Sequence, residues 1–185
     1  IKKVDLELKD LINSGIKGLT PYEPGKPIED LEREYGIKKA IKLASNESPL
    51  GPSPKVLEAL KEIISGINRY PDGNGSRLKE ALSSRHSLSA DTLTLGNGSN
   101  DIIEFVARCF LTPNDNAVYS KHAFAVYPLV TQSLGAQGVE VEARDWGHDL
   151  QAMLDAVNNK TKVVFIANPN NPTGTFLEKN EIIRF

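Results

Sequence analysis

The sequence predicts an α/β fold built on a largely parallel sheet, and two observations support this. From Thr92 onward, short apolar runs typical of strands alternate with longer runs that repeat apolar residues at helical spacing. Such alternation implies strand–helix–strand crossovers. The 185 residues are 39% hydrophobic and 25% charged, a composition that predicts a folded, water-soluble protein.

The first third of the chain is predicted to be helical or extended. Residues 5–14 are a short amphipathic helix candidate, and the turn-rich residues 18–27 are typical of an extended arm. A longer helix is expected over residues 54–65, because Ser53 can cap it and Pro54 fits its first position. Its apolar residues fall on one face: Val56, Leu57, Leu60, Ile63, Ile64 and Ile67.

The rest of the chain carries the strands and the helices between them. We expect strands at 92–95, 116–120, 138–142 and 161–168. The intervening helices are expected at 100–111, 123–134 and 149–157, after a helical segment at 77–84; another helix begins within 176–185.

Charge and cysteine content exclude several classes of function. Lys and Arg total 22 against 24 Asp and Glu, so no net basic field favours nucleic acid as a partner. No apolar run approaches the roughly 20 residues of a membrane span, and the charged start has no signal-peptide core, so no membrane partner is expected. The single Cys109 is expected to be buried and inert, which fits a cytoplasmic protein.

The most specific motif is Asn168-Pro-Asn-Asn-Pro-Thr-Gly174, which directly follows the strand expected at 161–168. Ligands of open α/β sheets bind beyond the carboxyl ends of the strands, so a site is expected here. Asparagine can donate an amide hydrogen bond without adding charge. On position alone, a proline-rich turn explains the motif equally well.

A second motif, Gly96-Asn97-Gly98-Ser99-Asn100-Asp101, joins an expected strand to an expected helix. Its glycines allow close approach of the backbone, and the helix start offers N–H groups and a positive dipole to a phosphate. The alternative is a tight turn with Ser99 or Asn100 as the N-cap. Asp101 stands where a dinucleotide fingerprint needs a third glycine.

Two further stretches carry aromatic residues beside turns. Residues 69–76 form a glycine-rich turn that contains Tyr70, and 122–127 place Phe124 just after a strand, where its ring could stack on a flat cofactor. Taken singly, a turn explains the first stretch and core packing explains the second.

Together, these segments resemble the histidinol-phosphate aminotransferase family in order and spacing. The resemblance covers essentially all 185 residues, which correspond to about the first half of such an enzyme. It rests on Tyr22–Gly25, Asn46–Gly51, Tyr70–Gly75, Gly96–Asp101 and Asn168–Gly174. It implies the large domain of a fold-type I, aspartate-aminotransferase-like transferase that depends on pyridoxal phosphate, truncated and preceded by an N-terminal arm. Residues 1–45 would then be the arm and part of the small domain, and 46–185 the first part of the cofactor domain.

The resemblance also implies how the cofactor, pyridoxal 5'-phosphate, would be bound. Gly98, Ser99 and Asn100 would hold its phosphate through backbone amides. Phe124 would lie on its pyridine ring, where many relatives have tyrosine. Asn171 would donate to its phenolate oxygen, with a cis bond to the following proline.

Other residues implied by the resemblance require a second subunit or a substrate. Tyr70 would reach the phosphate of the neighbouring subunit's cofactor, which implies a homodimer. Tyr22 and Asn46 would contact a small-molecule amino-acid substrate. The imine-forming lysine is expected beyond Phe185, so no catalytic lysine is assigned.

The implied activity is amino-group exchange between L-histidinol phosphate and 2-oxoglutarate in histidine biosynthesis. Two alternatives stay open. One is another fold-type I enzyme, such as an aromatic aminotransferase or a threonine-phosphate decarboxylase, and the other is a catalytically inactive cofactor-domain fragment.

Overall fold

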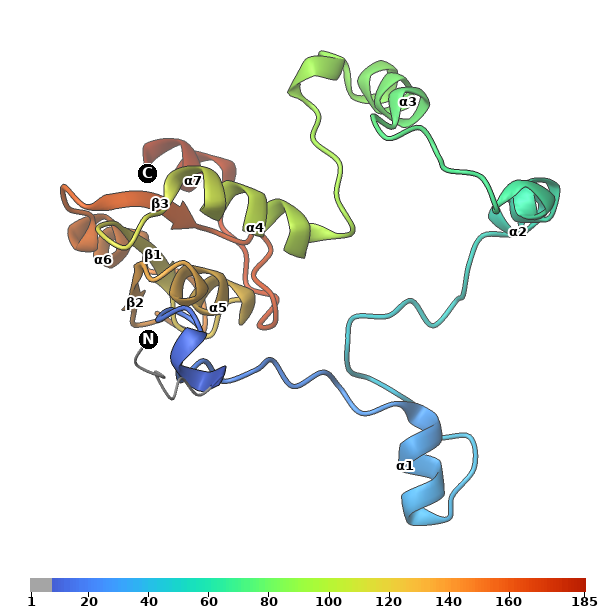
Figure 1. Cartoon of the computed structure of the whole chain (residues 1–185), viewed down its shortest axis with the longest axis horizontal. Helices are drawn as coiled ribbons and strands as arrows, with labels where there is room; N and C mark the ends of the chain where they lie inside the picture. Colours follow the sequence, from blue (N-terminus) through green and yellow to red (C-terminus); the bar gives the residue numbers. More distant parts are fainter. Residues whose placement is uncertain (1–7) are drawn as a thin grey trace, which may run out of the picture. The chain divides into compact units, whose positions relative to one another are not determined.

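A computed structural model of the chain describes residues 8–185 (Figure 1). The chain forms two compact units. The sheet unit joins the amino-terminal stretch up to Tyr22 to residues 96–185, and the helical unit comprises residues 23–95. The predicted division into an arm of 1–45 and a cofactor domain of 46–185 stays a prediction.

The sheet unit is built on three parallel strands, β1 (Asn116–Ser120), β2 (Gln137–Val141) and β3 (Thr161–Phe165). Their order is β2-β1-β3, so β1 is central and all five of its residues are buried. Helix α5 (Val126–Ser133) connects β1 to β2, and α6 (Leu150–Ala156) connects β2 to β3. The chain therefore reverses direction across the sheet after β2.

Helices cover both faces of this sheet (Figure 1). Helices α4 (Ser99–Phe110) and α5 pack on one face, and α6 packs on the other, where α7 (Lys179–Arg184) ends beside it. The core of the first face contains Ala107, Leu111, Ala117, Tyr119, Tyr127, Val130, Ala136, Val163 and Phe165. The core of the second contains Val118, Val141 and Met153.

Alternation along β1 explains why there are two cores. Successive side chains of a strand point to opposite faces, so Tyr119 packs under α5 while Val118 packs under α6. Val118 and Met153 are fully buried. A parallel sheet buried on both faces is the arrangement that the apolar runs predict.

The amino-terminal stretch joins the sheet unit through a close backbone approach. After the 3-10 helix η1 (Leu8–Leu11), Gly15 is buried against the end of α5. A Cβ atom at Gly15 would lie 2.4 Å from the main-chain oxygen of Gln132, so only glycine fits there. The structure describes only residues 8–14 of the helix predicted at 5–14, and it shows this shorter 3-10 turn.

The helical unit contains three α-helices and two 3-10 helices. None of the three α-helices buries a residue. The elements are α1 (Ile28–Tyr35), α2 (Pro54–Ile63), η2 (Ile64–Gly66), α3 (Ser76–His86) and η3 (Ala90–Thr92). Helix α2 confirms the prediction from Ser53 and Pro54, whereas α1 was not predicted.

Three of the four predicted strands are confirmed, and the fourth is wrong. Residues 92–95 end a 3-10 helix and continue without sheet pairing. A strand needs a neighbour for its N–H and C=O groups, and no described residue pairs with this segment. Residues 92–95 therefore have the apolar alternation of a strand but no described strand to pair with.

The prediction for Cys109 is also wrong, because its side chain is exposed. Helix α4 contacts the core through Ile103 and Ala107, which are four residues apart and share one face. Cys109 lies on the opposite side with Phe105, which is 45% exposed. Apolar residues occupy both sides of this helix, so periodicity alone did not identify the buried one.

Among residues 8–185, no helix combines the length and the apolar character that crossing a membrane requires.

Candidate functional site

The candidate site lies at the carboxyl edge of the sheet, between β1 and β3. The loop after β1 leads to α5 on one face, and the loop after β3 leads to α7 on the other. Adjacent strands whose connections leave in opposite directions form a topological switch point, where open α/β sheets bind ligands. The motif Asn168–Gly174 begins three residues after β3, so its predicted position is confirmed.

Asn170 fixes the loop after β3 to the loop after β1. Its side chain is 4% exposed, and its Nδ2 atom donates to the main-chain oxygen of His122 at 3.1 Å and to Oγ1 of Thr173 at 2.7 Å. Its main-chain N–H donates to the carbonyl of Thr175 at 2.7 Å, which closes the loop on itself. The sequence alone does not distinguish Asn170 from Asn168 and Asn171, which belong to the same motif.

Asn171 has a different environment from its neighbour. Its side chain is partly buried and makes no hydrogen bond with residues 8–185. The Asn171–Pro172 bond is cis, as predicted, and so is the Asn168–Pro169 bond. The Asn171 amide is therefore available to a ligand, while Asn170 holds the loop that carries it.

The start of α4 also presents unpaired donors. The helix precedes β1 and runs against it; its 12 residues span about 18 Å, so its start lies toward the carboxyl edge of the sheet. Gly98 is the N-cap, with φ 78° and ψ −178°, and no side chain caps the helix. The amides of Ser99 and Asn100 have no acceptor among the described residues. These exposed N–H groups at a positive helix end can bind an anion.

The alternative in which Ser99 or Asn100 is the N-cap is wrong, because Gly98 occupies that position. The carboxylate of Asp101 instead accepts from the main-chain N–H and the side chain of Asn97, at 2.8 and 3.1 Å. Asp101 thus closes the turn that precedes the helix. This arrangement leaves the Ser99 and Asn100 amides free.

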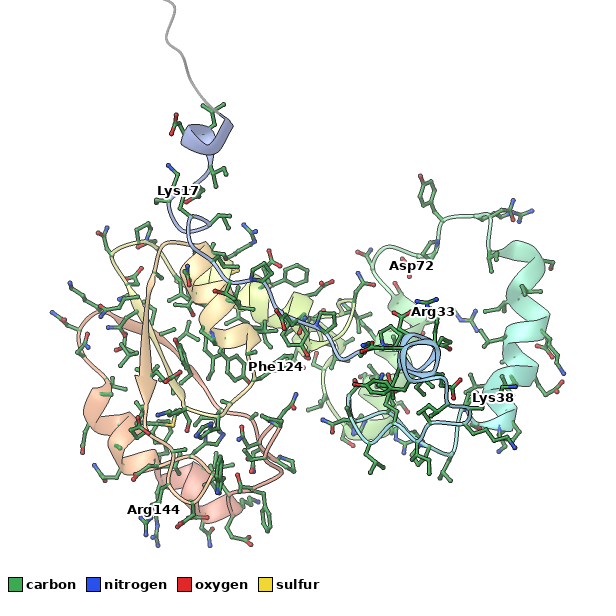
Figure 2. All side chains as sticks on the ribbon, turned by 90° about the horizontal axis from the view of Figure 1, so that it is seen from below. Lys17, Arg33, Lys38, Asp72, Phe124 and Arg144 are labelled. Atoms are coloured by element: carbon green, nitrogen blue, oxygen red, sulfur yellow. The ribbon has the colours of Figure 1, made fainter. Side chains whose placement is uncertain are left out.

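Phe124 lies in the loop that connects β1 to α5, and it packs on the face of the sheet that α4 covers (Figure 2). It is partly buried, and its ring meets that of Tyr127 edge-on with centroids 5.9 Å apart. Tyr127 stacks in turn on Phe165 at 4.6 Å with an interplanar angle of 8°. Burial raises the pKa of the Tyr127 hydroxyl above its usual 10.0. The inner rings belong to the core, while Phe124 retains exposed surface.

A third loop approaches the site after β2. Arg144 to Gly147 form a tight turn in which Asp145 and Trp146 both have positive φ. Beyond the turn, His148 is 8% exposed, and its Nε2 atom lies 2.9 Å from the carbonyl of Ala167. The sequence reasoning missed this turn; the run Asp-Trp-Gly between two apolar segments is the signal that could have revealed it.

Four lysines lie on the strands, loops and helix around the candidate site. Lys121 follows β1, and its Nζ atom forms an ion pair with Glu142 at 2.8 Å, a hydrogen-bonded contact that raises the pKa of Lys121. Lys160 and Lys162 lie at the start of β3, away from its carboxyl end, and Lys179 begins α7.

The remaining predicted residues are exposed to solvent. Tyr22 is 56% exposed at the end of the amino-terminal stretch. Asn46 and Tyr70 belong to the helical unit, where both are exposed. Across residues 8–185, no three His, Cys, Asp or Glu side chains are close enough to hold a metal ion.

The sequence is similar to known aminotransferases. Residues 38–184 match the family described as Aminotransferase class I and II. The chain is 55% identical over 175 residues to Histidinol-phosphate aminotransferase 1 of Nitrosococcus oceani, covering 95% of this chain and 47% of that protein. It is 56% identical over 177 residues to Histidinol-phosphate aminotransferase 2 of Pseudomonas aeruginosa, covering 95% and 48%.

Solved structures agree with these relatives. A histidinol-phosphate aminotransferase of Sinorhizobium meliloti, in complex with pyridoxal-5'-phosphate, aligns with a TM-score of 0.82 at 27% identity, covering 92% of this chain and 45% of that one. N-Succinyldiaminopimelate aminotransferase of Mycobacterium tuberculosis aligns with a TM-score of 0.72 at 25% identity, covering 83% and 43%. The expected fold and resemblance are thereby confirmed, and the chain spans about half the length of the curated relatives it matches.

Proposed function

Because this chain belongs to the class I and II aminotransferase family, we propose that the whole protein exchanges an amino group between L-histidinol phosphate and 2-oxoglutarate. Identity of about 55% to proteins named histidinol-phosphate aminotransferase, over 95% of the chain, supports this substrate pair above the alternatives. The proposed cofactor is pyridoxal 5'-phosphate, which is present in the aligned Sinorhizobium meliloti enzyme.

The observation that carries the proposal is the unpaired start of α4. The main-chain N–H groups of Ser99 and Asn100 donate no hydrogen bond to any described residue. Gly98 adopts a backbone conformation that essentially only glycine can adopt. These features fit the phosphate of the cofactor, which would accept both hydrogen bonds at the positive helix end.

Two side chains would orient the rest of the cofactor. Phe124 would offer its exposed ring surface to the pyridine ring, and the free amide of Asn171 would donate to the phenolate oxygen. Both residues follow strands that are neighbours in the sheet. The bound cofactor supplies an electron sink for the carbanion at the substrate's α-carbon. This part of the chain would bind and orient, while the imine-forming lysine is proposed to lie beyond Phe185.

Three further exposed residues would contact the cofactor of a second subunit or the substrate. We propose that Tyr70 reaches the cofactor phosphate of a second subunit in a homodimer, and that Tyr22 and Asn46 contact the substrate. The full exposure of Tyr70 is consistent with a role across an interface. A single cysteine is consistent with a cytoplasmic enzyme.

The whole protein should be purified with the cofactor and assayed with L-histidinol phosphate, phenylalanine and threonine phosphate in parallel. We expect kcat/KM for L-histidinol phosphate to be the highest, with 2-oxoglutarate as acceptor. Preference for phenylalanine, or carbon dioxide release from threonine phosphate, would favour the other fold-type I activities. No binding of the cofactor would contradict the proposal entirely.

Sedimentation of the same preparation tests the dimer. We expect a dimer, and Tyr70→Phe should lower affinity for the cofactor without changing sedimentation. A fully active monomer would contradict the role proposed for Tyr70.

A further inference from the structure

The turn at residues 144–148 is joined to the motif after β3 by side chains from both. His148 Nε2 lies 2.9 Å from the carbonyl of Ala167, one residue before the motif begins. A carbonyl oxygen only accepts, so Nε2 carries the hydrogen and donates it. The side chain of His148 is 8% exposed, and its bond to Ala167 joins the loop after β2 to the loop after β3.

A chain of hydrogen bonds runs from the motif back to the same turn. Asn170 Nδ2 donates to Oγ1 of Thr173 at 2.7 Å, and the hydroxyls of Thr173 and Thr175 lie 3.1 Å apart. Thr175 donates its hydroxyl to the carbonyl of Trp146 at 3.3 Å, so Thr173 must be the donor to Thr175. All donors in the chain therefore point from Asn170 toward the turn.

The loop after β1 completes the connection. The ring of His122 packs on that of Trp146 with centroids 4.9 Å apart, and the carbonyl of His122 accepts from Asn170. The loops at the ends of all three strands are thus linked through residues 122, 146, 148 and 170. The side chain of Asn171, which follows the buried Asn170 in the sequence, takes part in none of these bonds.

We propose that the turn at residues 144–148 positions the side chain of Asn171 for the cofactor, with His148 as the principal positioning residue. This inference rests on the proposed function. His148 does not touch the cofactor; it fixes the Ala167 carbonyl, and so the backbone from which Asn171 projects. A linked set of hydrogen bonds holds one loop conformation better than separate bonds do.

The test compares variants of the whole protein that differ in one donor. His148→Leu removes the bond to Ala167, whereas the side-chain amide of His148→Gln can still donate to it. His86→Leu makes the same change at an exposed histidine of α3, to which no role is assigned. Equilibrium dialysis gives the dissociation constant for pyridoxal phosphate, absorption spectroscopy gives the visible band of the bound cofactor, and circular dichroism reports folding.

We expect His148→Leu to weaken cofactor affinity about 2- to 12-fold, the range that one lost hydrogen bond gives, and to shift the visible band. His148→Gln should restore both towards wild type, and His86→Leu should match wild type. A folded His148→Leu with unchanged affinity and band overturns the inference while the proposed function stands. Failure of the wild-type protein to bind the cofactor overturns both.

Thr175→Val provides an independent test if His148→Leu does not fold. It keeps the side-chain shape but removes the donor to Trp146. Weaker cofactor binding with a shifted band supports the positioning role. Unchanged binding and an unchanged band overturn it.

Discussion

The side-chain amide of Asn170 donates to the main-chain oxygen of His122 across 3.1 Å, and this bond joins the loops that follow two neighbouring strands. The two residues are 48 positions apart in the sequence. Because Asn170 is 4% exposed, water cannot replace this bond without opening the loop.

Replacing Asn170 with alanine should therefore destabilise the sheet unit. Asn170→Ala leaves the His122 carbonyl and the Thr173 hydroxyl without their donor, and we expect the free energy of unfolding to fall by about 1–3 kcal/mol. Urea denaturation measures this change. Asn159→Ala, at an exposed turn, is the matched control and should stay within about 0.5 kcal/mol of wild type. Equal effects of the two variants would contradict the role given to Asn170.

Gly98→Ala should impair anion binding at the start of α4. With φ 78° and ψ −178°, Gly98 lies in a region that side chains avoid, so alanine costs on the order of 1–3 kcal/mol or changes the turn. Either outcome moves the amides of Ser99 and Asn100. Calorimetric titration with inorganic phosphate and with pyridoxal phosphate should show weaker binding.

Gly66→Ala is the control for that change. Gly66 has an ordinary φ and open space around its Cβ position. We expect its phosphate affinity to match wild type. Unchanged affinity in Gly98→Ala would exclude the α4 start as the phosphate site.

Asp115 should make stability depend on pH in the acid range. The Thr112 hydroxyl donates to its carboxylate at 2.6 Å and the Thr112 N–H at 2.9 Å, and these bonds lower the pKa of Asp115 below 3.8. A lowered pKa in the folded state stabilises the protein above pH 3.8, and this contribution is lost as pH falls through the folded pKa. Asp115→Asn should thus be less stable than wild type at neutral pH, by a margin that shrinks on acidification. Urea midpoints across the acid range measure this margin, and a constant one would contradict the assignment.

Tyr127 should ionise late on titration with base. Burial raises its pKa above 10.0, so its phenol stays protonated where an exposed phenol has lost its proton. The protonated form is favoured in the folded state, and this contribution to stability is lost as pH rises through the raised pKa. Absorbance at alkaline pH should show a late phase whose amplitude falls in Tyr127→Phe, where Tyr119 still contributes, and stays unchanged in Tyr70→Phe. An unchanged amplitude in Tyr127→Phe would assign the late phase to Tyr119 alone, whose pKa burial also raises.

Local signals made parts of the structure predictable from sequence. Ser53 and Pro54 mark the start of α2, and the apolar run at 116–120 identifies β1 without further information. The motif at 168–174 was placed correctly because the apolar run before it identifies β3, although that strand ends at Phe165 and not at 168. Residues 92–95 carry a comparable pattern, yet they lack a neighbouring strand in the described chain, and a strand depends on that neighbour.

The contacts that organise the candidate site could not be inferred in the same way. His148 meets Ala167 across 19 positions and Asn170 meets His122 across 48, so both pairings depend on strand order. The sequence contains these residues but does not show which of the loops after the strands lie next to each other. Once β1 is known to lie between β2 and β3, the three loops must converge.

The strand order β2-β1-β3 also predicts the order in which the strands pair during folding. Asn116 pairs with Gln137 in β2, whereas Ala117 pairs with Val163 in β3, across about twice the length of chain. Closing a loop of twice the length costs roughly 0.6 kcal/mol more in chain entropy. We therefore expect the β1–β2 ladder to form first during refolding and to acquire protection from hydrogen exchange earlier than β3. The edge strand β3, and with it the following loop at 168–174, would be the last part of the sheet to assemble.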